Sequence, residues 1–323
     1  MRVAVIGAGI SGLRVAQLLN ADGCDVHVFD KARGPSGRLA TRRSDAGSFD
    51  HGAQFFDARS ERFKAQVSDW CARDVVAKWN ARVVRICAGQ IEIETDGSER
   101  YVGVPRMSAI ARDMCNGLST TFSGRVVRVQ NVSGSFFLDL EGEESAGKFD
   151  LVISATPAPQ AVPLLESSPD LARRAAAARL HPCHALMARF EAEPDCEFDA
   201  AYVDSRALAW VASNASKPGR AEAANWTLHS TPDWTHAHLE ASPAEVRDAL
   251  LDAFRTAVGK PLPELQFSAT HRWLYSRADR SGIGEPLWDA DSGLGACGDW
   301  VVGDRVEDAF LSAEHLVAEI KAR

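Results

Sequence analysis

Paired cysteines are missing from this sequence of 323 residues. Its seven cysteines are odd in number and scattered, and no two are spaced as C-x-x-C. We therefore expect neither a disulfide framework nor a metal site, and we expect a reducing compartment, the cytoplasm. No stretch approaches the roughly 20 apolar residues that a membrane helix needs. The apolar run at the N-terminus is expected to form a strand rather than a signal peptide, so no membrane contact is predicted.

The sequence also lacks an excess of basic charge. It has 36 Lys and Arg against 44 Asp and Glu, which gives a net charge of −8 and a pI near 5.6. This balance disfavours nucleic acid and an anionic membrane surface as partners. The content of 46% hydrophobic and 25% charged residues is normal for a globular protein. The length is enough for two domains of ordinary size.

The segment VAVIGAGISGLRVAQLL at residues 3–19 predicts a strand, a glycine-rich turn and a helix. Gly7, Gly9 and Gly12 match G-x-G-x-x-G, which allows a tight turn, close approach of a pyrophosphate and packing of the helix on the strand. A second apolar strand ends at Asp30, 18 residues after Gly12, about where a carboxylate meets a ribose hydroxyl. The segment therefore predicts a dinucleotide without a 2′-phosphate on that ribose, and it does not separate NAD from FAD.

Three later segments favour FAD. Arg38, directly after Gly37, can bridge two phosphate oxygens. Val126 and Val127 are suited to an adenine pocket, although valines are also common in a plain core. Asp299 can accept ribityl hydroxyls, and the N-terminus of the helix predicted after it can stabilise negative charge on a reduced flavin. A domain that binds NAD alone needs no such C-terminal contact.

The order of these motifs resembles the flavin amine oxidase-like superfamily and, within it, the bacterial branch of the renalase family. The segments that carry the resemblance cover most of the chain: GAGISG, GRLATRR, FDHGAQFF, YVGVPRMSAIA, ISATPAP, WVASNASKPGR, HRWLYSRA and GDW. Arg106 departs from it, because a glycine is expected there. The resemblance implies FAD bound without a covalent link. The cofactor residues that it implies are Gly7, Gly9, Ser11, Gly12, Asp30, Lys31, Gly37, Arg38, Gln54, Phe55, Val126, Val127, Asp299 and Val306.

The resemblance also implies an activity. Renalase-type enzymes take hydride from 2- and 6-dihydro isomers of NAD(P), release NAD(P)+ and pass the electrons to O2 to give H2O2, which is a metabolite-repair role. A dihydronicotinamide that loses hydride releases no proton, so we assign no catalytic base. The pocket candidates, each of which has an ordinary core or rim role as its alternative, are Phe55, Trp210, Asn214, His271, Trp273 and Trp288.

Two polar segments carry further expectations. The loop with Asn214, Lys217 and Arg220 is either a solvated turn or, as the resemblance favours, a site for the phosphates or ribose of the substrate. Arg42 and Arg43 are expected to pair with acidic residues at positions 45 or 50.

We predict an α/β fold, in which a Rossmann-like FAD/NAD(P)-binding domain carries an inserted α+β substrate domain with a mixed sheet, as in monoamine oxidases. The first domain is expected over residues 1–65, 100–158 and 275–323, and the second over 66–99 and 159–274. The alternatives are a flavin-dependent amine oxidase or desaturase of the same superfamily, and a non-catalytic dinucleotide-binding regulator. An amine substrate would favour an aromatic cage, and tyrosine is scarce here, with three residues. The choice between NAD and NADP, the preferred isomer and the oligomeric state stay open.

Overall fold

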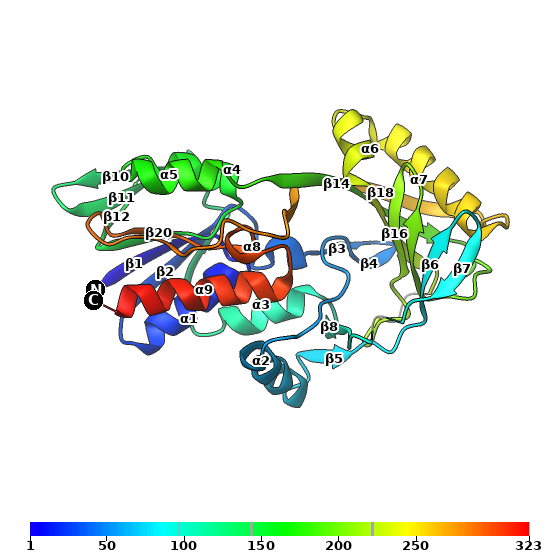
Figure 1. Cartoon of the computed structure of the whole chain (residues 1–323), viewed down its shortest axis with the longest axis horizontal. Coiled ribbons are helices and arrows are strands. Elements are labelled where there is room, and N and C mark those ends of the chain that lie inside the picture. The colour runs from blue at the N-terminus through cyan, green and yellow to red at the C-terminus, as the bar shows by residue number, and fades with distance from the viewer. Residues whose placement is uncertain (96, 143–144, 221–222, 323) are drawn as a thin grey trace.

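A six-stranded sheet forms the centre of one half of the molecule, which we call the nucleotide half (Figure 1). The structure is a computed structural model that describes residues 1–95, 97–142, 145–220 and 223–322. The strand order is β19-β20-β13-β1-β2-β9, and only β19 is antiparallel to its neighbour. The strands are β1 (Arg2–Ile6), β2 (Asp25–Asp30), β9 (Ser119–Phe122), β13 (Leu151–Ser154), β19 (Leu287–Asp289) and β20 (Leu294–Ala296). The parallel sheet predicted from the N-terminal segment is confirmed.

Two layers cover this sheet, one on each face, and β1 is therefore buried on both sides. Val3 points to one layer and Ala4 to the other, and neither is exposed to solvent. This explains why β1 is a continuous apolar run rather than an alternating one. The first layer consists of α1 (Ile10–Ala21), α3 (Ser108–Cys115) and α9 (Val306–Lys321). The second consists of β10 (Val126–Val132), β11 (Ser135–Leu140), β12 (Ala146–Phe149), α4 (Ala158–Ala161), η2 (Val162–Leu165), α5 (Pro169–Ala176) and α8 (Asp299–Val302).

Packing assigns two further segments to the nucleotide half. On α2 (Glu61–Ala72), the ring of Phe63 lies 5.2 Å from that of Phe310 on α9. On α5, Leu171 is buried in the same core as Ala4 of β1. The domain boundaries expected at residues 66 and 159 are therefore corrected, since each segment buries its apolar side on the nucleotide half. A short pair, β5 (Val76–Lys78) with β8 (Tyr101–Gly103), follows α2.

A seven-stranded sheet forms the other half, in the order β18-β14-β17-β16-β15-β6-β7 (Figure 1). Its strands are β6 (Val83–Cys87), β7 (Gln90–Ile93), β14 (Leu180–Phe190), β15 (Ala200–Asp204), β16 (Leu208–Ser213), β17 (Asn225–Ser230) and β18 (Leu265–Ala278). Helix α7 (Pro243–Val258) covers one face, and α6 (Pro232–Ala237) precedes it. A capping box of Ser242 and Glu245 starts α7. The face of the sheet that α7 does not cover contributes to the cavity described below.

The chain leaves the nucleotide half twice to form this sheet, and each time it leaves and returns at one place. Strands β14 and β18 pair from Leu180 opposite Ala278 to Phe190 opposite Leu265. Before the hairpin of β6 and β7, the N–H of Trp79 donates to the carbonyl O of Arg100 at 2.7 Å. No helix in the described ranges is long and apolar enough to cross a bilayer.

The segment after β2 contains a hairpin between the two halves. A single turn, η1 (Gly37–Leu39), precedes β3 (Thr41–Ser44), which pairs with β4 (Gly47–Asp50). The hairpin rests on β17, where the Asn225 side-chain amide donates to the carbonyl O of Ala46 at 3.0 Å. This contact places the residues that follow β4 at the junction of the halves.

Candidate active site

One cavity of about 2520 Å³ runs between the two halves. It is lined by residues of the glycine turn, the β3–β4 hairpin, β18 and the start of α9. A pocket for one drug-sized ligand measures roughly 300–1,000 Å³. The cavity therefore has room for a dinucleotide and a second ligand.

The glycine turn has the geometry that a dinucleotide requires. Gly7 has φ +117°, and a Cβ there would lie 2.8 Å from the carbonyl O of Ala155. A Cβ on Gly12 would lie 2.0 Å from the carbonyl O of Gly7, so α1 packs directly on the turn. Gly9 is the N-cap of α1, so no side chain of the N-cap residue occupies the N–H groups at the start of the helix. Because Gly9 and Ser11 line the cavity, the N–H groups of the first helical turn are available to a phosphate.

Asp30 closes the turn from the end of β2. Its Oδ2 accepts the N–H of Ala8 at 2.6 Å, and its Oδ1 accepts the N–H of Ala32 at 2.7 Å. Asp30 and Lys31 both line the cavity beside the turn. This is where a ribose contact is predicted.

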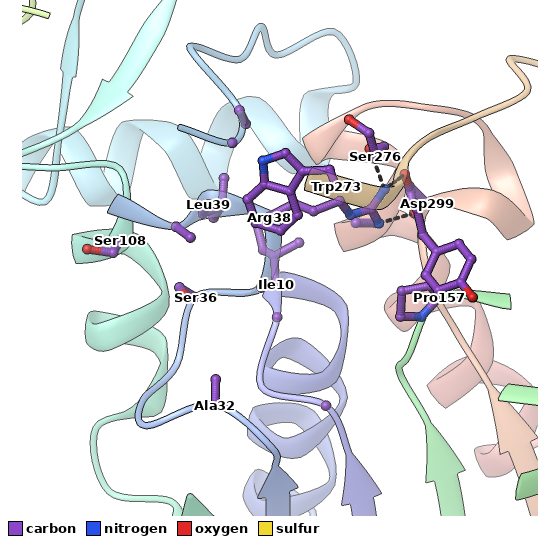
Figure 2. Close-up of a pocket in the computed structure, with 18 of the residues that line it drawn as sticks. Ile10, Ala32, Ser36, Arg38, Leu39, Ser108, Pro157, Trp273, Ser276 and Asp299 are labelled. Carbon is purple, nitrogen blue, oxygen red and sulfur yellow. Dashed lines mark hydrogen bonds and ion pairs between the residues drawn. The ribbon is translucent and has the colours of Figure 1, made fainter. Parts of the chain in front are cut away.

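Arg38 and Asp299 form a two-pronged ion pair at the cavity (Figure 2). Nη1 of Arg38 donates to Oδ2 at 2.7 Å and Nη2 donates to Oδ1 at 2.5 Å. Nη1 also donates to the carbonyl O of Ser276 at 3.1 Å. Burial lowers the pKa of Arg38 and the Asp299 carboxylate raises it, with a net increase. The pair joins the segment after the glycine turn to the start of α8, which are far apart in sequence.

Most of the residues predicted for the site line the cavity, and their contacts with ligands stay predictions. They are Gly7, Gly9, Ser11, Asp30, Lys31, Gly37, Arg38, Gln54, Phe55, Val126, Val127, Trp210, His271, Trp273, Asp299 and Val306. Gly12 lies behind the turn. Trp288 does not line the cavity, which corrects its assignment as a pocket residue. It sits on β19 at the sheet edge, where a Cβ on Gly295 would lie 3.1 Å from its ring.

The cavity wall on the seven-stranded sheet is one row of residues across five strands, which we call the histidine wall. His271 is opposite Ala185, Ala185 is opposite His229, His229 is opposite Trp210, and Trp210 is opposite Tyr202. Residues directly opposite one another point to the same face of a sheet. Sequence reasoning missed His229 and Tyr202, because the register between distant strands leaves no mark on either strand's pattern.

Trp210 brings an unused hydrogen-bond donor to this wall. Its side chain is 6% exposed, and Nε1 has no acceptor within the described residues. The rings of Phe55 and Tyr202 lie 5.5 and 4.7 Å from it and hold it in place. Since buried donors nearly always have a partner, this N–H fits an acceptor atom of a bound ligand.

The carbonyl O of His51 ties the β3–β4 hairpin to the wall. It accepts hydrogen bonds from Nε1 of Trp273 at 2.9 Å and from Nε2 of His229 at 3.1 Å. Burial lowers the pKa of His51 to about 4, with a further contribution from His271, and burial lowers that of His229 to about 4. Burial also lowers the pKa of His271. The three imidazoles are therefore uncharged at neutral pH and are weak bases.

These lowered pKa values predict a loss of stability in acid. Between pH 6.5 and 4 the unfolded chain takes up protons that the folded His51 and His229 do not, so stability is complete above 6.5 and falls toward 4. The slope is about 1.4 kcal/mol per pH unit for each histidine. Urea unfolding at pH 7 and 5 should show a drop about 2 kcal/mol smaller in His229→Gln than in the natural protein. His236→Gln, on the exposed side of α6, is the control, and an equal drop in all three proteins would contradict the prediction.

The polar side chains of Asn214, Lys217 and Arg220 in the loop at residues 214–220 are buried and do not line the cavity, which corrects the expectation that the loop binds substrate phosphates. The side chains of Lys217 and Arg220 are 0% and 1% exposed. Nη2 of Arg220 donates to Oδ2 of Asp50 at 2.5 Å, and Nζ of Lys217 lies 3.7 Å from the same oxygen. Asn214 accepts the N–H of Asp50 at 3.3 Å and is likewise core. We call Asp50, Lys217 and Arg220 the buried charge cluster.

The buried charge cluster fixes Gln54 at the cavity. Nζ of Lys217 donates to Oε1 of Gln54 at 3.0 Å, and the Gln54 amide donates to the carbonyl O of Asp50 at 2.5 Å. Burial raises the pKa of Asp50, but the opposing effect of Lys217 and Arg220 is larger, so the net pKa is lowered and the carboxylate is ionised. Burial lowers the pKa of Lys217 to about 8; Asp50 raises this pKa in part, and Arg220 lowers it further.

The cavity lining is basic although the chain is acidic. Arg42 and Arg43 line it and make no ion pair within the described ranges, so their expected pairing with Asp45 or Asp50 is wrong. The hydroxyl of Thr41 donates to Asp50 instead, at 2.6 Å. Among the described residues, twelve Lys and Arg and five Asp line the cavity. A cavity of this sign attracts phosphate-bearing ligands.

The two halves and the cavity between them define a dinucleotide-binding protein with room for a second ligand. Residues 5–70 match the NAD(P)-binding Rossmann-like domain family, and residues 84–320 match the flavin containing amine oxidoreductase family. The chain belongs to the flavin containing amine oxidoreductase family. The predicted Rossmann-like domain with a monoamine oxidase-like second part is confirmed, and the cofactor is FAD.

Individual relatives are similar over short segments or at low identity. A hydroxyneurosporene desaturase of Rubrivivax gelatinosus is 45% identical over 58 residues, which are 18% of this chain and 11% of the desaturase. The chain thus spans about a tenth of that relative. A structure described as a protoporphyrinogen oxidase of Exiguobacterium sp. 255-15 has a TM-score of 0.75 at 13% identity and covers 99% of this chain and 98% of its own. A redesigned putrescine oxidase has a TM-score of 0.72 at 12% identity, with full coverage of both chains. These structures share the fold.

The residues present fit FAD. The uncapped first turn of α1 suits its pyrophosphate, and Asp30 suits its adenine ribose. Arg38 and Asp299 offer a cation and a carboxylate for the phosphates and the ribityl chain. Val306 is the first residue of α9, whose start lines the cavity, so its N–H is available to the flavin.

Proposed function

We propose that this protein is an oxidase of the 2- and/or 6-dihydro isomers of NAD(P), with a role in metabolite repair. The bound FAD supplies the two-electron acceptor, and the overall balance is dihydro-NAD(P) + O2 + H+ → NAD(P)+ + H2O2. The observation that carries the proposal is the composition of the cavity: it is basic, has room for a second ligand beside FAD, and ends at a wall of uncharged imidazoles.

The wall suits a ring that gives up hydride. The loss of hydride from a dihydronicotinamide releases no proton, so the chain needs no base, and imidazoles with a pKa near 4 are poor bases at neutral pH. Trp273 and Phe55 provide flat surfaces that can orient the ring and exclude water. The free N–H of Trp210 can hold an uncharged acceptor such as a carboxamide oxygen.

An amine oxidase or a desaturase is the alternative, since a desaturase is among the relatives and a putrescine oxidase shares the fold. The charge of the cavity separates these candidates from the proposal. An ammonium substrate would enter a cavity lined by twelve cationic and five acidic side chains, and a hydrocarbon would leave a cation such as Arg42 without a counter-charge. A non-catalytic regulator is the second alternative, and it predicts a bound flavin that no donor reduces.

Anaerobic mixing of the holoenzyme tests the proposal. The visible flavin band is followed with 6-dihydro-NAD, 2-dihydro-NAD, ordinary NADH and an arylalkylamine in parallel. We expect fast bleaching by one or both isomers, and bleaching at least about a hundredfold slower by NADH and the amine, which is a difference of about 2.7 kcal/mol in barrier. Bleaching by the amine alone would move the protein to the amine oxidases, and no bleaching by any donor would favour the regulator.

A further inference from the structure

Arg42 is a cation at the cavity that neither the fold nor the predicted FAD contacts use. It lies on β3 and is exposed, and its side chain makes no ion pair or hydrogen bond within the part of the chain that the structure describes. Lys217 and Arg220, which were expected to bind substrate phosphates, are instead consumed by Asp50. The cavity therefore lacks its expected phosphate site and has a free guanidinium.

The register of the hairpin shows where Arg42 points. Arg42 is opposite Phe49, and opposite residues share a face of the hairpin. The ring of Phe49 stacks on that of Phe267 of β18 at 5.8 Å. His271 lies four residues further along β18 and so on the same face as Phe267. Arg42 is thus on the side of the hairpin that faces the histidine wall, in keeping with its share in lowering the pKa of His271, which follows mainly from burial.

We propose that Arg42 binds a phosphate of the substrate while the substrate's dihydronicotinamide ring lies against the histidine wall. The inference rests on the proposed function and identifies the group that favours a dinucleotide over the ring alone. A guanidinium matches two phosphate oxygens at once. The glycine turn and Arg38 are the residues predicted to contact the pyrophosphate of FAD, which leaves Arg42 to the second ligand.

The test compares two donors that share the dihydronicotinamide riboside, one of which also carries the pyrophosphate and the adenosine. Arg42→Gln holoenzyme is reduced anaerobically with 6-dihydro-NAD and with 6-dihydronicotinamide riboside, and each Kd is taken from the saturation of the rate. We expect the Kd of the dinucleotide to rise about tenfold and that of the riboside to change less than about twofold. Arg255→Gln, an equal charge change on the exposed side of α7, should leave both unchanged.

A second readout is independent of turnover. Oxidised holoenzyme is titrated with NAD+, and binding is followed by the perturbation of the flavin spectrum. A Kd of NAD+ that rises about tenfold in Arg42→Gln, and not in Arg255→Gln, supports the proposal. An equal rise in the Kd of the dinucleotide and of the riboside, or no rise in either Kd, overturns the proposal for Arg42 and leaves the proposed function in place. If no dihydro compound reduces the natural protein, the proposed function fails and the NAD+ titration decides on Arg42 by itself: unchanged or absent binding overturns the site.

Discussion

Asp50→Asn is expected to lower the free energy of unfolding by about 3–5 kcal/mol. Asp50 is fully buried, and its carboxylate is the counter-charge of Lys217 and Arg220, which are 0% and 1% exposed. The amide keeps the shape and an acceptor for Thr41, but it leaves two cations buried without a compensating charge. Such a loss is large against a total stability of about 5–15 kcal/mol, so the variant should also retain little FAD.

Asp113→Asn is the matched control. It breaks an ion pair with Arg73, whose side chain is 43% exposed, and a pair of this kind contributes about 0–1 kcal/mol. Urea unfolding at pH 7 measures all three proteins, and flavin absorbance after purification reports the retained FAD. A loss in Asp50→Asn no larger than that in Asp113→Asn would show that the buried charge cluster does not hold the halves together.

Gly12→Ala is expected to yield protein without flavin. The added Cβ would lie 2.0 Å from the carbonyl O of Gly7, and a backbone oxygen cannot turn away as a flexible side chain can. The helix must therefore move off the turn, which displaces the N–H groups that face the pyrophosphate. The ratio of visible to ultraviolet absorbance of the purified protein should fall to the level of apoprotein, and excess FAD should not restore it.

Two glycines of the cavity lining provide a control and a comparison for Gly12→Ala. Gly34 has no atom within 4 Å of an added Cβ, so Gly34→Ala should keep its flavin. At Gly9 the nearest atom, Cα of Gly37, is 3.9 Å away, so Gly9→Ala should fold and yet bind FAD more weakly, because its methyl group faces the phosphates. Full flavin content in Gly12→Ala would mean that the turn adapts and that the packing argument is wrong.

Local chemistry made the nucleotide half predictable. The glycine turn and the strand that ends at Asp30 each depend on residues within a few positions of one another. The spacing of Gly7, Gly9 and Gly12 constrains the backbone directly, whatever the rest of the chain does. These predictions needed no knowledge of which strands pair.

The substrate side was less predictable, because distant contacts build it. His229 and Tyr202 join His271 only through the register of five strands. Lys217 and Arg220 suggest an exposed loop, since lysine and arginine are rarely buried, yet their partner Asp50 lies more than 160 residues earlier. Asp50 pairs with these two cations, whereas Arg42 and Arg43 at the cavity have no ion pair among the described residues, which reverses the assignment made from the sequence.

The chain leaves the nucleotide half and returns to it at the same place in both segments that form the seven-stranded sheet, and this affects how such a protein can diversify. The pair Leu180–Ala278 and the bond between Trp79 and Arg100 fix each point of exit beside its point of return. Closing a longer loop between fixed ends adds only about 0.6 kcal/mol for each doubling of its length. Loop insertions and deletions beyond these ends that keep Lys217 and Arg220 beside Asp50 can therefore accumulate without disturbing the strands of the nucleotide half. A graft made at those two positions should leave the flavin site intact if the grafted sheet supplies two cations in the places of Lys217 and Arg220.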